Sequence, residues 1–203
     1  MSRKKLIRTT ELPYHITCRS NNKEWFELPM NEVWNIALRS LEIAHKKHPI
    51  TLISFVLMSN HYHMLLRTPH ENLDKFMYEF NKNFSLLVRY RAYRENRIFG
   101  NRYKWCLINS QKYFYNCYKY VYQNPMRARI TLRCEDYPYS TLYYITRHKR
   151  FVIPVHDLFG FKDEFNLIML NQMQSENEIF SVRNALRKPE LTMLKDPVRR
   201  VYL

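Results

Sequence analysis

Hydrophobic and polar positions in the first 140 residues follow two periods, and each period predicts one kind of element. Short runs rich in β-branched and aromatic residues predict strands, and polar turn residues mark where the strands end. These runs cover residues 14–19, 51–58, 61–67 and 105–108. Ser59 and Asn60 form a turn signal between the second and third runs, so these two strands are expected to make a hairpin.

Three longer segments carry apolar residues three and four positions apart, which is the spacing of one helix face. They span about residues 30–47, 72–94 and 112–123. We expect Asn31 to cap the first helix, and Pro49 lies just past its end. The third helix is expected to end before Pro125, because proline disfavours helical geometry in the residue before it. The apolar stripe of the second helix consists of Leu73, Phe76, Met77, Phe80, Phe84, Leu87 and Tyr90.

The order of these elements is strand, helix, strand, strand, helix, strand, helix, which predicts an α+β fold. We expect a ferredoxin-like or RRM-like antiparallel sheet with helices on one face, to which the last helix is added. After about Ser140 the pattern weakens, since Pro154 and Pro189 interrupt it. We therefore predict one domain over residues 1–140 and a basic C-terminal extension, helical in part, over residues 141–203.

Charge and overall composition exclude several classes of protein. With 33 Lys and Arg residues against 18 Asp and Glu residues, the 203-residue chain carries a formal net charge of +15. Hydrophobic residues make up 46%, which is enough for a core and excludes a disordered basic tail. No run of about 18 apolar residues predicts a spanning helix, and the basic N-terminus lacks the apolar region of a signal peptide. We therefore expect a cytoplasmic protein with no membrane partner.

The contents of glycine, aromatic residues and cysteine exclude further classes of protein. Only two glycines are present, which excludes the glycine-rich phosphate loops of P-loop and Rossmann proteins. The 16 tyrosines and 12 phenylalanines, combined with excess positive charge, are typical of a protein whose partner offers phosphates and bases. A basic protein with an aromatic core is the alternative that composition leaves open. The four cysteines lack zinc-knuckle spacing, so we expect reduced thiols in small apolar spaces.

His61-Tyr62-His63 is the most specific chemical feature of the sequence. Residues two apart on a strand point to the same face, so the two imidazoles are expected to project together while Tyr62 turns into the core. Imidazole suits several transition ions and is compatible with a magnesium or manganese site completed by substrate oxygens. A pair of surface or stacking histidines would have the same pattern, so these residues alone do not decide.

The third predicted helix is rich in tyrosine, and Tyr120 lies four residues before Asn124, so the two share a helix face. Asn124 could offer an amide oxygen to a metal. Tyr120 could act as a nucleophile, because a phenolate attacks phosphorus or carbon once its proton is withdrawn. Packing and stacking are the ordinary roles of tyrosines in such a stretch, and composition alone does not single out one of them.

A run of cations lies between the second helix and the next strand, opposed within that stretch only by Glu95. A solvated basic face is the ordinary interpretation of such a run. The skew to one sign favours a groove that follows a nucleic-acid backbone. The cations are Arg89, Arg91, Arg94, Arg97, Arg102 and Lys104.

Five segments, taken in this order, resemble the single-tyrosine HUH transposases, and most of all the REP-associated tyrosine transposases. They are residues 14–22 (YHITCRSNN), 55–66 (FVLMSNHYHMLL), 98–104 (IFGNRYK), 120–128 (YVYQNPMRA) and 136–140 (DYPYS). The resemblance covers about residues 10–142. The hairpin segment and the Asn-Pro-x-Arg-Ala motif are specific in combination.

The resemblance implies roles for four residues. His61 and His63 match the metal ligands of the family. Asn124 matches its polar ligand, and Tyr120 matches its nucleophile. The resemblance also implies a Mg²⁺ or Mn²⁺ cofactor and single-stranded or hairpin DNA as the partner. In such enzymes the tyrosine attacks a scissile phosphate, which leaves a 5′-phosphotyrosine link and a free 3′-OH.

Two positions depart from the family pattern, which often has glycine where this chain has Ser20 and Arg129. Ser20 can alter a turn, and Arg129 adds charge near the site. None of the four candidate catalytic positions is lost, so the resemblance implies an active enzyme.

DNA contact is expected from basic and polar residues near these motifs and in the extension, which in REP-associated relatives often helps to grip DNA. These relatives recognise short palindromic hairpins and tend to act as monomers, so we expect a monomer rather than a dimer. The candidate DNA-binding residues are Arg19, Asn22, Arg97, Arg102, Lys104, Arg127, Arg129, Arg187, Lys188, Arg199 and Arg200.

The sequence is compatible with three functions. The first is a metal-dependent single-stranded DNA endonuclease and strand transferase. The second is a non-catalytic module on the same fold that binds single-stranded nucleic acid on its sheet. The third is a metal-dependent phosphoesterase for small substrates, against which the charge of +15 argues.

Overall fold

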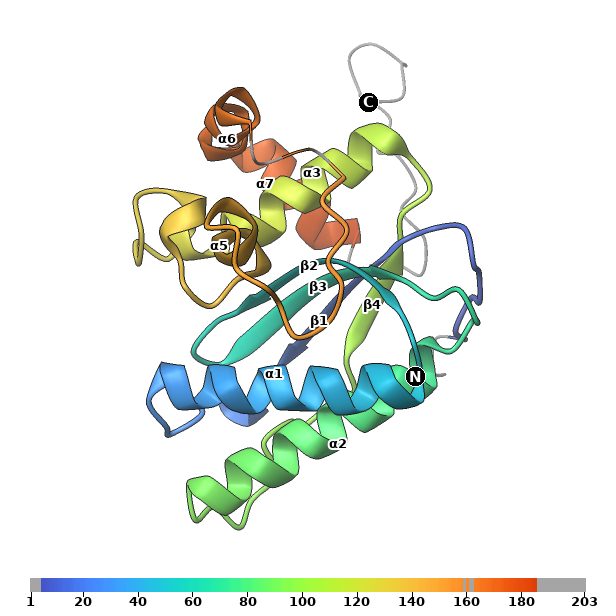
Figure 1. Cartoon of the computed structure of the whole chain (residues 1–203), viewed down its shortest axis with the longest axis vertical. Coiled ribbons are helices and arrows are strands. Elements are labelled where there is room, and N and C mark those ends of the chain that lie inside the picture. The colour runs from blue at the N-terminus through green and yellow to red at the C-terminus, as the bar shows by residue number, and fades with distance from the viewer. Residues whose placement is uncertain (1–4, 159, 161–162, 186–203) are drawn as a thin grey trace.

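The computed structural model describes residues 5–158, 160 and 163–185. Its centre is a four-stranded antiparallel sheet in the order β2-β3-β1-β4 (Figure 1). The strands are β1 (Tyr14–Arg19), β2 (Thr51–Leu57), β3 (His61–Arg67) and β4 (Lys104–Leu107). The predicted hairpin of β2 and β3 is confirmed, with Leu57 opposite Tyr62. Because β1 pairs with both β3 and β4, the first strand of the chain is an inner strand of the sheet.

One face of the sheet is covered by α1 (Met30–Lys47) and α2 (Leu73–Arg91), which lie side by side below the strands in Figure 1. Trp34 of α1 stacks on Phe55 of β2 with the ring centroids 5.4 Å apart. Phe80 of α2 makes an edge contact with Phe55 at a centroid distance of 6.2 Å. These side chains belong to the larger hydrophobic core, in which each fully buried aromatic ring contributes about 1.5–3 kcal/mol.

The start of α1 differs from the prediction that Asn31 is its cap. The helix begins at Met30, and the residue before it is Pro29, whose backbone is extended. The backbone carbonyl of Pro29 accepts hydrogen bonds from the amides of Glu32 and Val33. Proline suits this position because its fixed φ and missing N–H cost nothing at a helix start. Asn31 therefore lies exposed inside the first turn.

The buried stripe of α2 also differs at its C-terminal end. Leu87 is half-buried and the side chain of Tyr90 is 78% exposed, whereas Val88 is fully buried. Val88 follows Phe84 by four residues and so stays on the buried face, while Tyr90 turns away from it. The helix ends at Arg91, three residues before the predicted end.

The second face of the sheet is covered too, so helices lie on both faces rather than one. It packs against α3 (Gln111–Tyr122), which lies above the strands in Figure 1 and is followed in the chain by α4 (Asn124–Arg127). Leu65 of β3 and Cys106 of β4 join Tyr118 and Val121 of α3 in this second core. The later helices are η2 (Cys134–Asp136), α5 (Thr141–Thr146), α6 (Glu164–Asn171) and α7 (Glu176–Ala185).

The chain after residue 140 packs tightly on the sheet and on α3. The hydroxyl of Thr141 accepts a hydrogen bond of 2.9 Å from the Phe55 amide, and the His156 amide donates to the Leu52 carbonyl at 2.8 Å. The Nε2 of Gln123 donates to the carbonyl of Leu170 in α6 and to that of Gln172, which follows the helix. The expected helical content of this segment is confirmed by α5, α6 and α7. The domain boundary at residue 140 stays a prediction.

The turn after β1 is joined to the loop that precedes β4. The short helix η1 (Asn21–Lys23) starts the turn, and the Asn21 amide donates to the Ile98 carbonyl at 2.7 Å. A Cβ atom on Gly100 would lie 2.3 Å from Asn21 Oδ1, so glycine is what lets the two segments approach. The contact places Asn21 and Asn22 beside the loop that carries Arg97 and Arg102.

The state of the cysteines and the length of the apolar helices were both predicted from the sequence. All four cysteines are buried among apolar side chains and none forms a disulfide, as the sequence predicted. Within the described residues, no helix is both long and apolar enough to cross a membrane.

Candidate active site

His61 and His63 lie on the face of β3 that packs against α3. Their ring centroids are 5.2 Å apart and the ring planes are nearly perpendicular, at 87°. Tyr62, between them, turns into the opposite core, where its hydroxyl donates to Asn81 Oδ1 at 2.7 Å. His61 is half-buried, and its Nδ1 lies 2.7 Å from Asn60 Oδ1. The strand alternation predicted from the sequence therefore brings both imidazoles to one place.

Tyr120 of α3 lies against this pair of histidines. Its ring centroid is 5.6 Å from that of His63 in an edge contact, and the side chain is 6% exposed. The neighbouring Tyr118 and Tyr122 pack on each other instead, with centroids 4.9 Å apart. Among the ring contacts of the described residues, Tyr120 is the tyrosine of α3 that meets His63.

Asn124 follows Tyr120 by four residues, although a separate short helix begins at it. Its Nδ2 donates to the backbone carbonyls of Tyr120, at 2.9 Å, and Val121, at 3.2 Å. These bonds occupy the two hydrogens of the amide and hold the side chain at the end of α3. Oδ1 is consequently the atom with which Asn124 can bind a further group.

Arg127 lies over the ring of Tyr120, where the sequence predicted only a DNA contact. Its guanidinium carbon is 4.3 Å from the ring centroid, and Nη2 donates to the Tyr120 carbonyl at 2.7 Å. Nη1 is buried and has no hydrogen-bond partner among the described residues. Burial lowers the pKa of Arg127 to about 10, so the group stays cationic at neutral pH. The site thus contains a half-buried cation with one buried, unused donor group beside Tyr120.

His15 is a member of this cluster that the sequence prediction missed. It lies on β1 and is fully buried, with Nε2 3.0 Å from Nδ1 of His63. Thr17 is directly opposite His63 in the sheet, so His15, two residues earlier, projects to the same face. The sequence signal is the strand alternation of residues 14–19, but it identifies His15 only once the pairing of β1 with β3 is known.

The environment keeps all three imidazoles uncharged at neutral pH. Burial lowers the pKa of His15 to about 3. Burial, and then the charge of Arg19, lower the pKa of His61 to about 4. The pKa of His63 is also well below its usual range, because of burial first and then the neighbouring charges. Neutral imidazole is the form that binds metal ions.

The basic run after α2 is partly neutralised, which the sequence did not predict. Arg91 pairs with Glu32 of α1 at 3.2 Å. Arg94 pairs with Glu24 and also with Glu27, the latter at 3.6 Å. Glu95 is therefore not the only acidic residue that opposes this run. Among the described ion pairs, Arg97, Arg102 and Lys104 have no acidic partner, and all three side chains are exposed.

The other predicted DNA-binding residues divide into two groups. Arg19 is exposed and lies opposite His61 in the sheet, so it is beside the site. Asn22 and Arg129 are exposed and have left-handed backbone conformations, with φ of 52° and 57°. The remaining four lie outside the described residues: Arg187, Lys188, Arg199 and Arg200.

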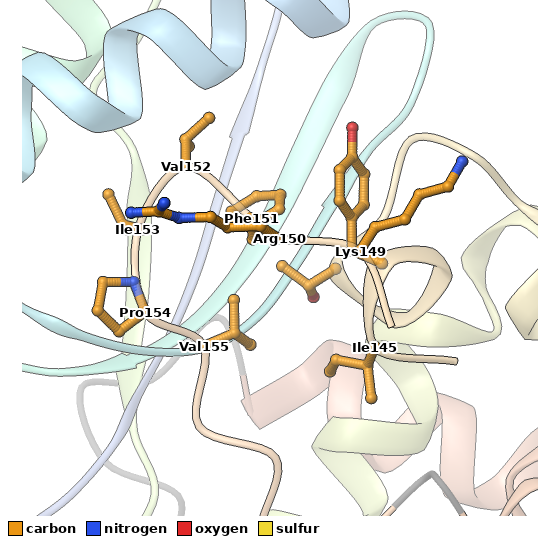
Figure 2. A pocket seen from close by; sticks show the side chains of 10 residues that line it. Ile145, Lys149, Arg150, Phe151, Val152, Ile153, Pro154 and Val155 are labelled. Carbon is orange, nitrogen blue, oxygen red and sulfur yellow. The ribbon is translucent and has the colours of Figure 1, made fainter. Parts of the chain in front are cut away.

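A separate pocket of 310 Å³ lies by the edge strand β2 (Figure 2). Thr141, Tyr144 and Ile145 of α5 form one part of its wall, and residues 149–155 form the rest. Figure 2 shows the side chains of Lys149 and Arg150 at this pocket. None of the predicted site residues that the structure describes lines it, so it is distinct from the histidine and tyrosine cluster.

Comparison with solved structures defines the class of fold. The structure resembles a REP-associated tyrosine transposase bound to a REP hairpin, with a TM-score of 0.59 and 17% sequence identity over 78% of this chain and 93% of that chain. A second similar structure is a putative transposase from Deinococcus radiodurans R1, with a TM-score of 0.39 and 14% identity over 60% of this chain and 94% of that chain. The α+β fold expected from the sequence is confirmed by the first of these.

The family follows from the sequence itself. The model of the family described as "Transposase IS200 like" matches residues 8–124, more than half of the chain. This protein therefore belongs to the IS200-like transposase family, and the family resemblance seen in the sequence is confirmed. His15, His61, His63 and Tyr120 all fall within the matched region. A search of curated proteins returns no significant match.

Proposed function

We propose that this protein is a metal-dependent single-stranded DNA endonuclease and strand transferase that acts on hairpin or palindromic DNA through a 5′-phosphotyrosine intermediate. Membership of the transposase family supplies the class of reaction. The observation that supports the mechanism most directly is the edge contact of Tyr120 with His63, at 5.6 Å, beneath the guanidinium of Arg127.

The donor atoms at this site suit a magnesium or manganese ion. Nδ1 of His61 and Nδ1 of His63 are each engaged by a neighbouring side chain, which leaves Nε2 of each ring for a metal. Asn124 adds its Oδ1. Within the described residues no group of three or more His, Cys, Asp or Glu side chains is arranged to hold a metal, so the amide and substrate oxygens would complete the set. A bound Mg²⁺ or Mn²⁺ would supply Lewis-acid polarisation of the scissile phosphate.

Tyr120 performs the covalent step in this proposal. Its Oη forms a bond to phosphorus as the bond from phosphorus to the 3′-oxygen breaks. The phenolic proton leaves Tyr120, and the released 3′-oxygen takes up a proton. The new phosphotyrosine keeps the phosphodiester energy, so a 3′-OH can reverse the step and join strands without ATP.

Arg127 is proposed to assist this step through its position. The unused Nη1 is a charge-assisted donor for a phosphate oxygen, and the cation over the ring stabilises negative charge on Tyr120. The hydrogen bond from Nη2 to the Tyr120 carbonyl fixes the guanidinium before DNA arrives.

DNA is proposed to bind along the exposed cations that surround the site. Arg19 and Lys104 flank it on β1 and β4, and Arg97 and Arg102 extend the surface along the loop. The backbone contacts of such a surface give affinity without base specificity. The cytoplasm remains the proposed location and a monomer the proposed state, as the resemblance to REP-associated transposases implies.

The basic turn after α5 is a second proposed contact for DNA. Arg147 and Lys149 both lie over the ring of Tyr143, at 4.0 and 5.1 Å from its centroid, and Arg150 follows. Arg147 also contacts Asp136, so Lys149 and Arg150 are the less neutralised pair. This turn lies in the C-terminal extension, which the sequence predicted to help grip DNA, although the residues named there were others.

A cleavage assay tests the proposal. Labelled hairpin oligonucleotides with single-stranded flanks are incubated with the protein and Mn²⁺ or Mg²⁺, and covalent adducts are separated on denaturing gels. We expect an adduct with the wild type and with Tyr115→Phe, a control on the same helix, and none with Tyr120→Phe. Hairpin binding by the wild type without any adduct would instead favour the non-catalytic binding module.

A further inference from the structure

The imidazole of His15 makes its side-chain hydrogen bond to a proposed metal ligand. Its Nε2 is 3.0 Å from Nδ1 of His63, the ring centroids are 5.2 Å apart, and both side chains are buried. Its other nitrogen, Nδ1, is buried without a partner among the described residues. The ring also makes an edge contact with Tyr120, at a centroid distance of 6.0 Å. His15 thus contacts both Tyr120, the proposed nucleophile, and His63, a proposed metal ligand. It lies outside the His-Tyr-His motif and outside the tyrosine helix.

One hydrogen atom lies between the two rings, and its location decides what His63 can do. When Nδ1 of His63 carries the hydrogen, Nε2 of His15 accepts it, and Nε2 of His63 presents a lone pair. The neutral ring of His15 then carries its own hydrogen on the buried Nδ1. When Nε2 of His15 carries the hydrogen, a neutral His63 must carry its own hydrogen on Nε2 and cannot ligate a metal there. Both arrangements fit the 3.0 Å distance between Nε2 of His15 and Nδ1 of His63, but only the first leaves Nε2 of His63 able to bind a metal.

We propose that His15 is a positioning residue that holds His63 in the Nδ1–H tautomer, so that Nε2 of His63 is open to a metal ion. The inference rests on the proposed function, which makes His63 a ligand. Metal-binding histidines in general donate their second N–H to a fixed acceptor, which orients the ring and makes the ligand more basic. Here the acceptor is an imidazole on the neighbouring strand, at a distance that the sheet register fixes.

The hydrogen location can be measured directly in the metal-free protein. Long-range ¹H–¹⁵N spectra of the full chain, labelled with ¹⁵N-histidine, distinguish protonated from unprotonated ring nitrogens. At neutral pH we expect a protonated Nδ1 and an unprotonated Nε2 in His63, and an unprotonated Nε2 in His15. A His63 ring protonated on Nε2 would overturn the proposal, whatever the metal affinity.

Metal binding gives a second, independent test. Mn²⁺ affinity is measured by the free-ion EPR signal for the wild type, His15→Leu and His15→Gln, with unfolding curves to establish that each variant folds. Glutamine keeps an acceptor oxygen near the Nε2 position, and leucine does not. We expect about a tenfold or greater loss for His15→Leu, and a smaller loss for His15→Gln. His45→Leu, on α1, is the control and should bind Mn²⁺ as the wild type does.

The outcomes separate the inference from the function on which it rests. Equal Mn²⁺ affinity of folded His15→Leu and wild type would overturn the positioning role while leaving His63 as a ligand. Absence of Mn²⁺ binding in the wild type would instead contradict the proposed metal site. In that case the NMR measurement alone still decides the tautomer.

Discussion

The two faces of the sheet are made from the same strands but have different contents. Toward α1 and α2, the strands present Tyr62, Met64 and Phe55, which pack in a continuous apolar core. Toward α3, the alternate positions of β3 present His61 and His63 before the apolar Leu65. The first face is an apolar core, and one end of the second carries the proposed catalytic residues. Strand alternation is what allows both in a single short strand.

Electrostatics differ between the faces as well. Three uncharged imidazoles and one half-buried guanidinium meet at the α3 face, and all have their pKa values lowered by burial first. Buried polar groups lower the stability of a folded protein unless hydrogen bonds offset the loss of water. They gather at functional sites, where chemistry requires them. Changes on the two faces should therefore separate stability from activity.

Phe80→Ala is expected to give the largest effect, and to change stability alone. Phe80 is fully buried and contacts Phe55 and Tyr62 with ring centroids 6.2 and 5.2 Å away. Removing the ring leaves a cavity, which typically costs about 3–5 kcal/mol. Urea unfolding measures the loss, and cleavage per folded molecule should stay at the wild-type level. Loss of cleavage in the folded fraction would show that the two faces are not separable.

Arg127→Ala is the matching change on the α3 face. It removes the cation over Tyr120 and the buried Nη1 donor, so we expect the adduct to form about 100-fold more slowly. Single-turnover rates at saturating hairpin measure the effect, and Arg183→Ala on α7 is the control. An unchanged rate would mean that Arg127 acts only in binding.

Acid should destabilise the metal-free protein through the α3 face. The pKa values of His15 and His61 are about 3 and about 4 in the folded chain, against about 6.5 when unfolded. Between these values the unfolded chain binds more protons, so stability is full above pH ~6.5 and falls as pH drops. Each histidine contributes up to about 1.4 kcal/mol per pH unit to the free energy of unfolding.

Unfolding curves at pH 7, 6 and 5 test this dependence. His15→Gln should reduce the slope of stability against pH, whereas His70→Gln, at an exposed position, should leave it unchanged. A stability that is constant from pH 7 to pH 5 would contradict the expected buried and neutral state of these rings.

Arg129→Gly should give the smallest effect, and with the opposite sign. Arg129 has a left-handed φ of 57°, a backbone conformation that favours glycine. Glycine adopts this conformation without strain, so we expect a gain of about 0.5–1 kcal/mol in stability. Arg129→Ala removes the same charge without relieving the backbone and should give no gain. Equal stability of the two variants would contradict the strain argument.

Much of this architecture could be predicted because it is local. The strand at residues 61–67 and a helix over about residues 30–47 follow from periodicity, and the shared face of His61 and His63 follows from alternation. His15 could not be found in this way. Its contact with His63 spans 48 residues of sequence and depends on the register between two strands that are not neighbours in the chain.

Other features were missed for the same reason. The guanidinium of Arg127 lies over the ring of Tyr120, seven residues earlier, and this contact crosses the junction between α3, which ends at Tyr122, and α4, which begins at Asn124. Arg94 meets Glu24 and Glu27 across about 70 residues. Packing between distant segments decides the contacts of Arg94, and periodicity carries no information about them.

Mapping the covalent adduct tests the central claim most directly. Wild-type protein is reacted with a hairpin oligonucleotide and Mn²⁺, digested, and the nucleotide-bearing peptide is identified by mass spectrometry. The account predicts that the phosphotyrosine lies at Tyr120, joined to the 5′ phosphate of the cleaved strand, and that Tyr120→Phe yields no such peptide. An adduct at Tyr113, Tyr115, Tyr118 or Tyr122, or an undiminished adduct in Tyr120→Phe, would contradict it.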